Sequence, residues 1–246
     1  MAAWSGRRSD ERLDARPGPQ LLDEMRRDRV LLLFLNRLPD LLPHRLERRR
    51  ARSPRRRESL RIGLEGGAGL LVGVAPDTPE ALVEFYLKNG FSAAFDPNVE
   101  DEGLMAEILA AFAEADIVIA ETPAFGINIA DPNDKLREAN LDRICRRLER
   151  AERVGACCCV GHGGTPNTPK MWQHNPDNFS QANIDRCVDG IQRILDAVQP
   201  QHTKFVLETE SRILPDSPDI YLEMIEAVDR PGFGVHLDPV NIVSSP

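Results

Sequence analysis

Two acidic residues each end a short apolar run. Glu208 follows Phe205-Val-Leu, and Asp238 follows Phe233-Gly-Val-His-Leu. They lie 30 residues apart with a helical segment between them, which is the spacing of one βα repeat. Because the carboxyl ends of parallel strands meet at one rim, we expect both carboxylates to lie there. Two hard oxygen ligands at one rim predict a divalent-metal site, although either acid alone would suit a helix cap or an arginine partner.

Three further residues are candidates for the same rim. His236 lies two residues before Asp238, so in an extended strand both side chains point to one face. A substrate contact, a supporting role beside Asp238 and a satisfied core histidine all stay open for His236. His162 ends an earlier strand between glycines that let a ligand approach the backbone closely, and we expect it to be catalytic. Glu121 ends the strand before that one and is a weaker candidate for substrate binding.

Strands and helices that would position these residues alternate from residue 61 onward. Strands are predicted over 61–65, 91–95, 116–122 and 156–162, with two more ending at Glu208 and Asp238. Helices are predicted over 79–89, 102–114, 134–153, 180–198 and 218–228. The six βα steps take about 31 residues each, as in an eight-stranded barrel of about 250 residues. The fold class is therefore α/β, a (β/α)8 TIM barrel type truncated to about six βα units over 61–246.

Residues 1–60 have a different composition. They hold 16 arginines and 9 acidic residues, a net charge of +7, and show no strand pattern. We expect a poorly ordered, Arg-rich extension, with one amphipathic helix over 21–38; a tail for nucleic acid or a membrane surface is the alternative. The other 186 residues carry 15 basic and 30 acidic side chains, a net charge of −15. An acidic body argues against nucleic acid as its main partner.

Cysteine content and hydropathy indicate a cytoplasmic protein. Three of the five cysteines are consecutive, at 157–159 within an apolar run, and are expected to act as small hydrophobic residues on a buried strand. The sequence has no Cys-x-x-Cys pair, and the odd cysteine count favours a reducing compartment. The longest apolar run, at 30–35, is far shorter than the roughly 20 residues of a membrane-spanning helix. No membrane association is expected.

Three motifs together resemble the xylose isomerase-like barrel superfamily. These are Gly161-His-Gly-Gly164, Leu207-Glu-Thr209 and Val235-His-Leu-Asp-Pro-Val-Asn241, and the resemblance covers about 61–246. That superfamily contains sugar and sugar-phosphate isomerases and epimerases, and also the apurinic endonucleases of the endonuclease IV type. The resemblance implies a small sugar or sugar phosphate as the substrate.

The resemblance also implies a ligand set. In that superfamily a Glu, an Asp, a His and a Glu on strands five to eight hold one divalent cation, commonly Mn²⁺ or Mg²⁺, with Zn²⁺ as a further possibility. Glu208 and Asp238 match the first two positions, and the other two lie beyond Pro246. Glu208 would be both a metal ligand and an acid/base that moves a proton through an enediolate. His162 matches the position where the endonucleases keep a metal-binding histidine.

One departure from the pattern separates the alternatives. Many epimerases and the endonucleases carry a histidine three residues after the strand-six Asp, where this chain has Asn241, a candidate for substrate binding. The substitution counts against an endonuclease IV-like phosphodiesterase, which stays the alternative to an isomerase or epimerase. A truncated, non-catalytic barrel is the third interpretation. Open strand edges in such a barrel would favour a homo-oligomer.

Overall fold

The computed structural model describes residues 32–34, 61–63, 78–167, 171–238 and 241. Within these ranges, seven parallel strands form one sheet whose spatial order follows the chain order. The strands are β1 (Leu32–Phe34), β2 (Arg61–Gly63), β3 (Ala93–Phe95), β4 (Val118–Pro123), β5 (Cys158–Gly161), β6 (Lys204–Glu208) and β7 (Phe233–His236). Parallel pairing between consecutive strands is the arrangement that βα repeats produce in a barrel wall. The strands predicted to end at Glu208 and Asp238 are thus β6 and β7.

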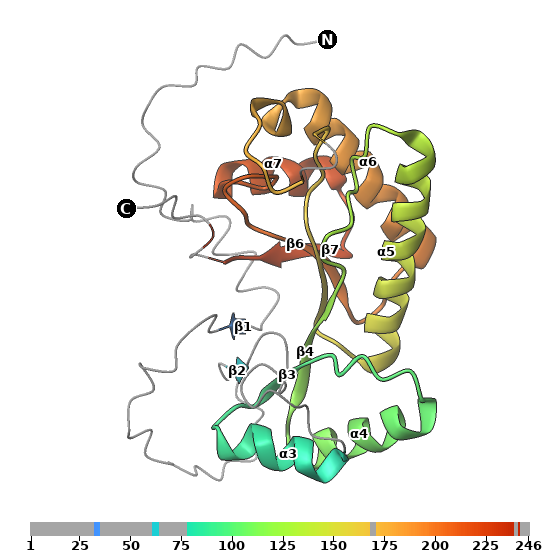
Figure 1. Ribbon diagram of the computed structural model, residues 1–246, viewed down its shortest axis with the longest axis vertical. Helices are drawn as coiled ribbons and strands as arrows, with labels where there is room; N and C mark the ends of the chain where they lie inside the picture. Colours follow the sequence, from blue (N-terminus) through green and yellow to red (C-terminus); the bar gives the residue numbers. More distant parts are fainter. Residues whose placement is uncertain (1–31, 35–60, 64–77, 168–170, 239–240, 242–246) are drawn as a thin grey trace.

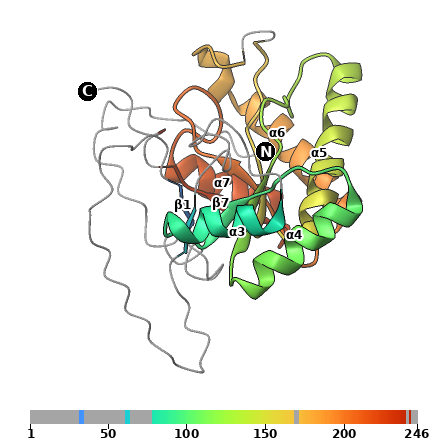
Figure 2. The same cartoon turned by 60° about the horizontal axis from the view of Figure 1, so that its bottom comes forward.

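Five α-helices connect the strands from β2 onward and cover one face of the sheet (Figure 1). They are α3 (Pro79–Lys88), α4 (Glu102–Glu114), α5 (Asp134–Val154), α6 (Gln181–Val198) and α7 (Pro218–Val228), with a short 3₁₀ turn, η1 (Pro176–Phe179), before α6. In the turned view α3 and α4 lie side by side (Figure 2), and they pack against each other. No helix of the described ranges is long and apolar enough to cross a membrane.

Local sequence signals set the helix boundaries. Thr78, Asp101 and Ser217 each precede a helix, and each side chain accepts a hydrogen bond from a backbone amide of the first turn. Such caps satisfy amides that have no partner within the helix. Gly155 ends α5 with φ of 69°, a conformation that glycine adopts without strain. The predicted bounds of the helices are confirmed to within about two residues, the usual uncertainty of helix ends.

Alternation along the strands divides the buried side chains between two faces. Phe205 and Leu207 point toward the helices and belong to the main core, whereas Val206 packs with Cys158 and Val160 on the other face. Successive strand residues point to opposite faces, and the register places Val160 beside Val206 and Glu208 beside His236. The face of Val206 therefore also receives Glu208 and His236. Cys158 and Cys159 are buried on β5, as predicted, whereas Cys157 precedes the strand and is half-buried. Burial raises the pKa of Cys159 to about 12.

Two sequence predictions are wrong in detail. Leu32–Phe34 is a strand paired with β2, although a helix was predicted over 21–38 and no strand before 61. A continuous apolar run suits a buried parallel strand as well as a helix, and hydrophobic periodicity does not separate them over so few residues. The other residues of 21–38 lie outside the described ranges. β7 ends at His236, so Asp238 lies two residues beyond its strand rather than at its end.

A buried ion pair joins the residue after β3 to helix α5. Asp96 follows β3, and its carboxylate accepts hydrogen bonds of 2.7 Å from both Nε and Nη2 of Arg150 on α5. Thr122 of β4 donates a third hydrogen bond to the same carboxylate. Burial raises the pKa of Asp96, but the bonds from Arg150, the Asn98 amide and Thr122 outweigh that effect, so the pKa lies below its usual value. The ion pair therefore stabilises the fold where Asp96 is ionised.

We predict that Arg150→Met lowers the free energy of unfolding by about 3 kcal/mol, because it leaves the Asp96 carboxylate buried without its counter-charge. Urea denaturation followed by circular dichroism measures this value. The control is Arg193→Met, which breaks an exposed pair with Glu138 and should cost less than about 1 kcal/mol. Equal costs for the two substitutions would contradict the structural role of the buried pair.

The wild type and the Arg150→Met variant also test how the contribution of the Asp96–Arg150 pair to stability depends on pH. The folded-state pKa of Asp96 lies below its unfolded value in the wild type, so the contribution to stability is present above the unfolded pKa and is lost as pH falls through the folded pKa. We therefore predict that the stability difference between wild type and Arg150→Met shrinks as the pH is lowered from neutral toward about 3. A difference that is independent of pH would show that the charge of Asp96 is not involved.

Candidate active site at the carboxyl ends of β5, β6 and β7

Glu208 and His162 form a buried hydrogen bond at the rim of the sheet. Oε2 of Glu208, the last residue of β6, lies 3.0 Å from Nε2 of His162, which follows β5. The two side chains are 9% and 7% exposed. Burial raises the pKa of Glu208, but the contact with His162 and the charge of His236 outweigh it, so the pKa lies below its usual value. The site thus keeps Glu208 in its ionised form.

Asn241 and Asp238 approach Glu208 from the segment after β7. Nδ2 of Asn241 donates a hydrogen bond of 2.8 Å to Oε1 of Glu208, so both carboxylate oxygens have a partner. The carboxyl group of Asp238 also comes within hydrogen-bonding reach of Glu208. Thr209 fixes the backbone of Asp238, because its hydroxyl accepts from the Asp238 amide at 2.8 Å. Thr209 lies in the Leu207-Glu-Thr209 motif but is not among the predicted site residues.

A second acid–histidine pair lies deeper in the same face of the sheet. Oε2 of Glu121 on β4 is 3.2 Å from Nε2 of His236 on β7, and the Glu121 side chain is 1% exposed. Burial lowers the pKa of His236, but the carboxylates of Glu121, Glu208 and Asp238 outweigh it, so the pKa is raised. The structure therefore brings all six predicted site residues to one end of the sheet.

Close backbone packing explains the glycines around His162. A Cβ atom on Gly163 would lie 2.1 Å from the carbonyl oxygen of Leu214, and one on Gly164 would lie 2.2 Å from the amide nitrogen of Ala130. The amide of Gly163 donates a hydrogen bond of 3.0 Å to the same Leu214 oxygen. These contacts fix the backbone on which His162 stands. The glycines are needed for this close approach of the chain.

Two aromatic rings enclose His162. Trp172 meets the imidazole edge-on with ring centroids 4.6 Å apart, and Phe125, from the segment after β4, lies 5.0 Å away. Trp172 belongs to the polar stretch 166–178, but its contact with His162 was not predicted. Among the described residues, Nδ1 of His162 has no hydrogen-bond partner although it is buried.

Tyr221 of α7 supports the strands beneath the site. Its fully buried hydroxyl lies 3.0 Å from the amide of Leu207 and 3.2 Å from the amide of His236. It also lies 2.7 Å from the carbonyl oxygen of Leu207. A phenol can accept two hydrogen bonds and donate one, so these partners satisfy it completely. The amphipathic pattern of α7 predicts that Tyr221 is buried but does not reveal this contact.

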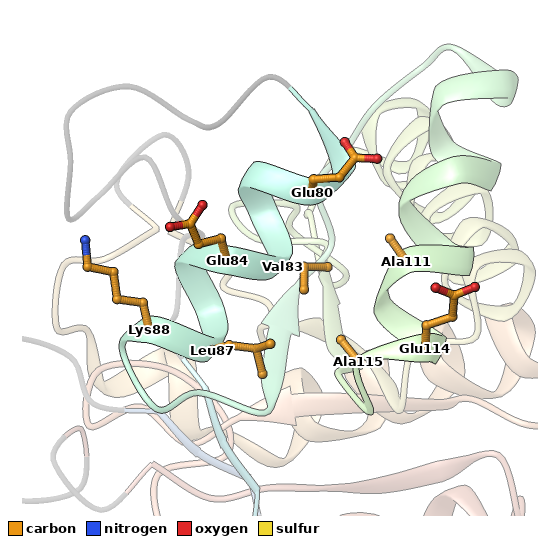
Figure 3. A pocket seen from close by; sticks show the side chains of 8 residues that line it. All are labelled: Glu80, Val83, Glu84, Leu87, Lys88, Ala111, Glu114 and Ala115. Atoms are coloured by element: carbon orange, nitrogen blue, oxygen red, sulfur yellow. The ribbon is translucent and has the colours of Figure 1, made fainter.

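A groove lies between α3 and α4, away from the rim (Figure 3). It has a volume of about 740 Å³, and its floor is formed by Val83, Leu87, Ala111 and Ala115. Charged side chains at its edges include Glu80, Glu84 and Glu114. None of its lining residues stands at the carboxyl end of a strand. This groove is therefore separate from the candidate active site.

The donor set at the rim fits part of a metal centre. The side chain of Asp238 lies within hydrogen-bonding reach of Glu208 and lowers the pKa of the Glu208 carboxyl group, so two acidic side chains lie beside each other. Among the described residues, however, no group of three or more His, Cys, Asp or Glu side chains has the arrangement of a metal site. The described residues thus place two carboxyl groups, Glu208 and Asp238, at the rim, the two positions for which the sequence predicts metal ligands.

Comparisons with known proteins agree with this architecture. A family model described as "Xylose isomerase-like TIM barrel" matches residues 81–245. A search of curated proteins found no match. Among solved structures, the probable 3-DHS dehydratase AsbF of Bacillus anthracis aligns with 20% identity and a TM-score of 0.51, over 66% of this chain and 58% of that one.

Two further solved structures, of proteins with other named activities, also align with this chain. A D-psicose 3-epimerase of Clostridium cellulolyticum, solved with D-tagatose, has 18% identity and a TM-score of 0.51, over 63% of this chain and 56% of that one. Endonuclease IV of Thermus thermophilus has 14% identity and a TM-score of 0.51, over 67% and 59%. The chain thus spans under three-fifths of the length of each of these proteins. At these identities the likeness shows the fold, and the predicted α/β fold of the TIM barrel type is confirmed.

We predict that Gly163→Ala lowers the free energy of unfolding by about 3 kcal/mol, because the new methyl group would overlap the Leu214 carbonyl. Chemical denaturation measures the loss. The control is Gly126→Ala, where φ is 69° but no atom lies near the added Cβ, so only backbone strain of about 1 kcal/mol is expected. A Gly163→Ala protein as stable as the wild type would show that this close approach does not exist.

Proposed function

Since the chain belongs to the xylose isomerase-like TIM barrel family, we propose that it is a sugar or sugar-phosphate isomerase or epimerase. The observation that carries this proposal is the meeting of His162, Glu208 and Asn241 at one rim, with Asp238 beside them. A buried carboxylate that is held ionised can take a proton from a carbon next to a carbonyl group. Sugar isomerisation and epimerisation through an enediolate require this step.

Glu208 has the role of the acid/base in this proposal. Its depressed pKa keeps it able to accept a proton at neutral pH. His162 contacts one of its oxygens and Asn241 the other, and these two contacts restrict the orientation of the carboxylate. His162 still has Nδ1 to offer to a sugar oxygen. Glu121, His236 and Asn241 are assigned to the binding of sugar hydroxyl groups.

A divalent cation, Mn²⁺ or Mg²⁺, is part of the proposal, and Glu208 and Asp238 would hold it. When bound, such an ion polarises neighbouring carbonyl and hydroxyl oxygens of a sugar. The closeness of the two carboxyl groups supports this assignment. Two carboxylates leave the rest of the coordination sphere to other ligands.

We propose a ketose as the substrate class. The epimerase structure was determined with D-tagatose. Endonuclease IV shares the fold, but at 14% identity that likeness shows the fold alone. The expected histidine of the endonucleases is Asn241 here, and Nδ2 of Asn241 is occupied by Glu208. A ketose substrate is therefore preferred over a nucleic acid.

We predict that Glu208→Gln reduces turnover by about 10³-fold, because the amide cannot accept the proton. The assay is ¹H NMR of ketoses in D₂O, which follows the loss of hydrogen from the carbon next to the carbonyl and the appearance of the epimer. The control is Glu210→Gln, a carboxylate two residues further along the same segment whose Oε1 receives a hydrogen bond from Ser211. Proton exchange that continues unchanged in a folded Glu208→Gln protein would overturn the role of Glu208.

We predict that Asp238→Asn weakens Mn²⁺ binding by at least about tenfold, because one charged oxygen ligand is lost. Electron paramagnetic resonance of free Mn²⁺ measures affinity without any need for turnover. Asp229→Asn is the control, since it makes the same charge change at an exposed residue after α7. Equal Mn²⁺ affinity in the two variants would remove Asp238 from the ligand set.

A further inference from the structure

A second groove is lined by arginines of α5. It has a volume of about 550 Å³ and lies between one face of α5, Glu100 and the segment 123–127 that follows β4. Five arginines of the helix contribute to its wall, and each lies three or four residues from another of the set: Arg143, Arg146, Arg147, Arg150 and Arg153. This spacing places them on a single face of the helix. We call this feature the arginine groove.

The groove carries a concentrated positive charge. Asp96 neutralises Arg150, and Glu100 is the one acidic side chain that lines the groove among the described residues. Arg143 and Arg147 donate hydrogen bonds to the uncharged amide oxygens of Asn140 and Asn98. Four arginines thus face one acidic residue in a chain whose net charge is −8. A local field of this sign within an acidic protein attracts anions.

Other arginines of the described residues are partnered differently. Arg186, Arg193 and Arg230 each form an ion pair with an aspartate or glutamate of the described residues. Among those same residues, no ion pair joins a carboxylate to Arg143, Arg146, Arg147 or Arg153. A helix face that only kept the protein soluble would be expected to intersperse both signs of charge. Within the part of the chain that the structure describes, four guanidinium groups at the arginine groove thus have no carboxylate at ion-pair distance.

The packing of the helices leaves room for a ligand at this place. α3 packs against α4, α5 against α6, and α6 against α7, whereas few residues of α4 reach α5. In Figure 1, α4 and α5 lie apart, with the segment between β3 and α4 beside the lower end of α5. The arginine groove lies where α4 and α5 make little contact with each other.

One side chain connects the arginine groove to the candidate active site. Phe125 lines the groove, and its ring centroid lies 5.0 Å from that of His162. The segment 123–127 therefore has the arginines on one side and the rim on the other. A ligand that lies across Phe125 would contact both places.

We propose that the arginine groove binds a phosphate group of a small phosphorylated molecule. Guanidinium groups offer paired N–H donors that match phosphate oxygens, and clustered arginines are the usual protein partners of phosphate. The volume of the groove suits a small ligand, whereas nucleic acid requires an extended basic surface that the acidic body does not provide. The phosphate belongs either to a sugar phosphate that also occupies the rim, which rests on the proposed function, or to a separate organic phosphate.

Binding of inorganic phosphate to the full chain tests the site without any need for catalysis. Isothermal titration calorimetry should detect binding to the wild type and at least about tenfold weaker binding to the double variant Arg146→Gln/Arg147→Gln. The control Arg193→Gln/Arg230→Gln makes the same change of net charge away from the groove and should bind as the wild type does. Arg146→Lys/Arg147→Lys keeps the charge and should retain part of the affinity. Circular dichroism confirms that each variant is folded.

The source of the phosphate is determined by comparing D-fructose 6-phosphate with D-fructose. Tighter binding of the phosphorylated ketose than of either D-fructose or inorganic phosphate, weakened both by the groove variant and by Glu208→Gln, assigns the phosphate to the substrate. Binding no tighter than that of inorganic phosphate, and unaffected by Glu208→Gln, assigns it to a separate ligand. Both results support the site, and the second would hold even if no epimerase activity existed.

Three results would overturn the proposal. In the first, inorganic phosphate at millimolar concentration does not bind the wild type. In the second, it binds the groove variant and the wild type equally well. In the third, a short DNA duplex binds the groove at lower concentration than either phosphate compound and the groove variant abolishes that binding. The arginines would then serve nucleic acid rather than a small phosphate.

Discussion

The parallel register of β4 to β7 is the constraint on which the site depends. Because strand residues alternate between two faces, the pairing of Val160 with Val206 and of Glu208 with His236 determines which side chains share one face. A shift of one residue in β6 would move Glu208 into the apolar core beneath the helices, and would bring Leu207 to the rim. The chemistry of the rim is thus a consequence of how the sheet is paired. Tyr221 reinforces this pairing at the last residues of β6 and β7, where its hydroxyl contacts the backbone of both strands.

Charge compensation is the second constraint. The rim and the strands beneath it bury several carboxylates, and three of them have defined partners. Glu121 meets His236, Glu208 meets His162, and Asp96 meets Arg150. Removal of a carboxylate from water is costly unless such a partner is present. The same logic makes the arginine groove unusual, because there four of the five arginines have no ion-pair partner among the described residues.

Much of this architecture could be predicted from the sequence. The alternation of apolar strands with capped helices predicted the parallel sheet, and α4 has the bounds that its sequence predicts. The rim residues were predictable because acids and histidines end apolar runs at a regular spacing. Their partners were less accessible. Contacts such as Arg150 with Asp96 join residues 54 apart, and local patterns carry no information about which arginine meets which acid. The strand at Leu32–Phe34 was missed because a short apolar run suits a strand and a helix equally well.

The most direct test is a crystal structure of the full chain grown with Mn²⁺ and a ketose, in which anomalous scattering locates the metal. The account predicts an anomalous peak in contact with the carboxylates of both Glu208 and Asp238, with the sugar beside His162. A Mn²⁺ ion that binds away from these two carboxylates, with the ketose absent from the rim, would contradict it.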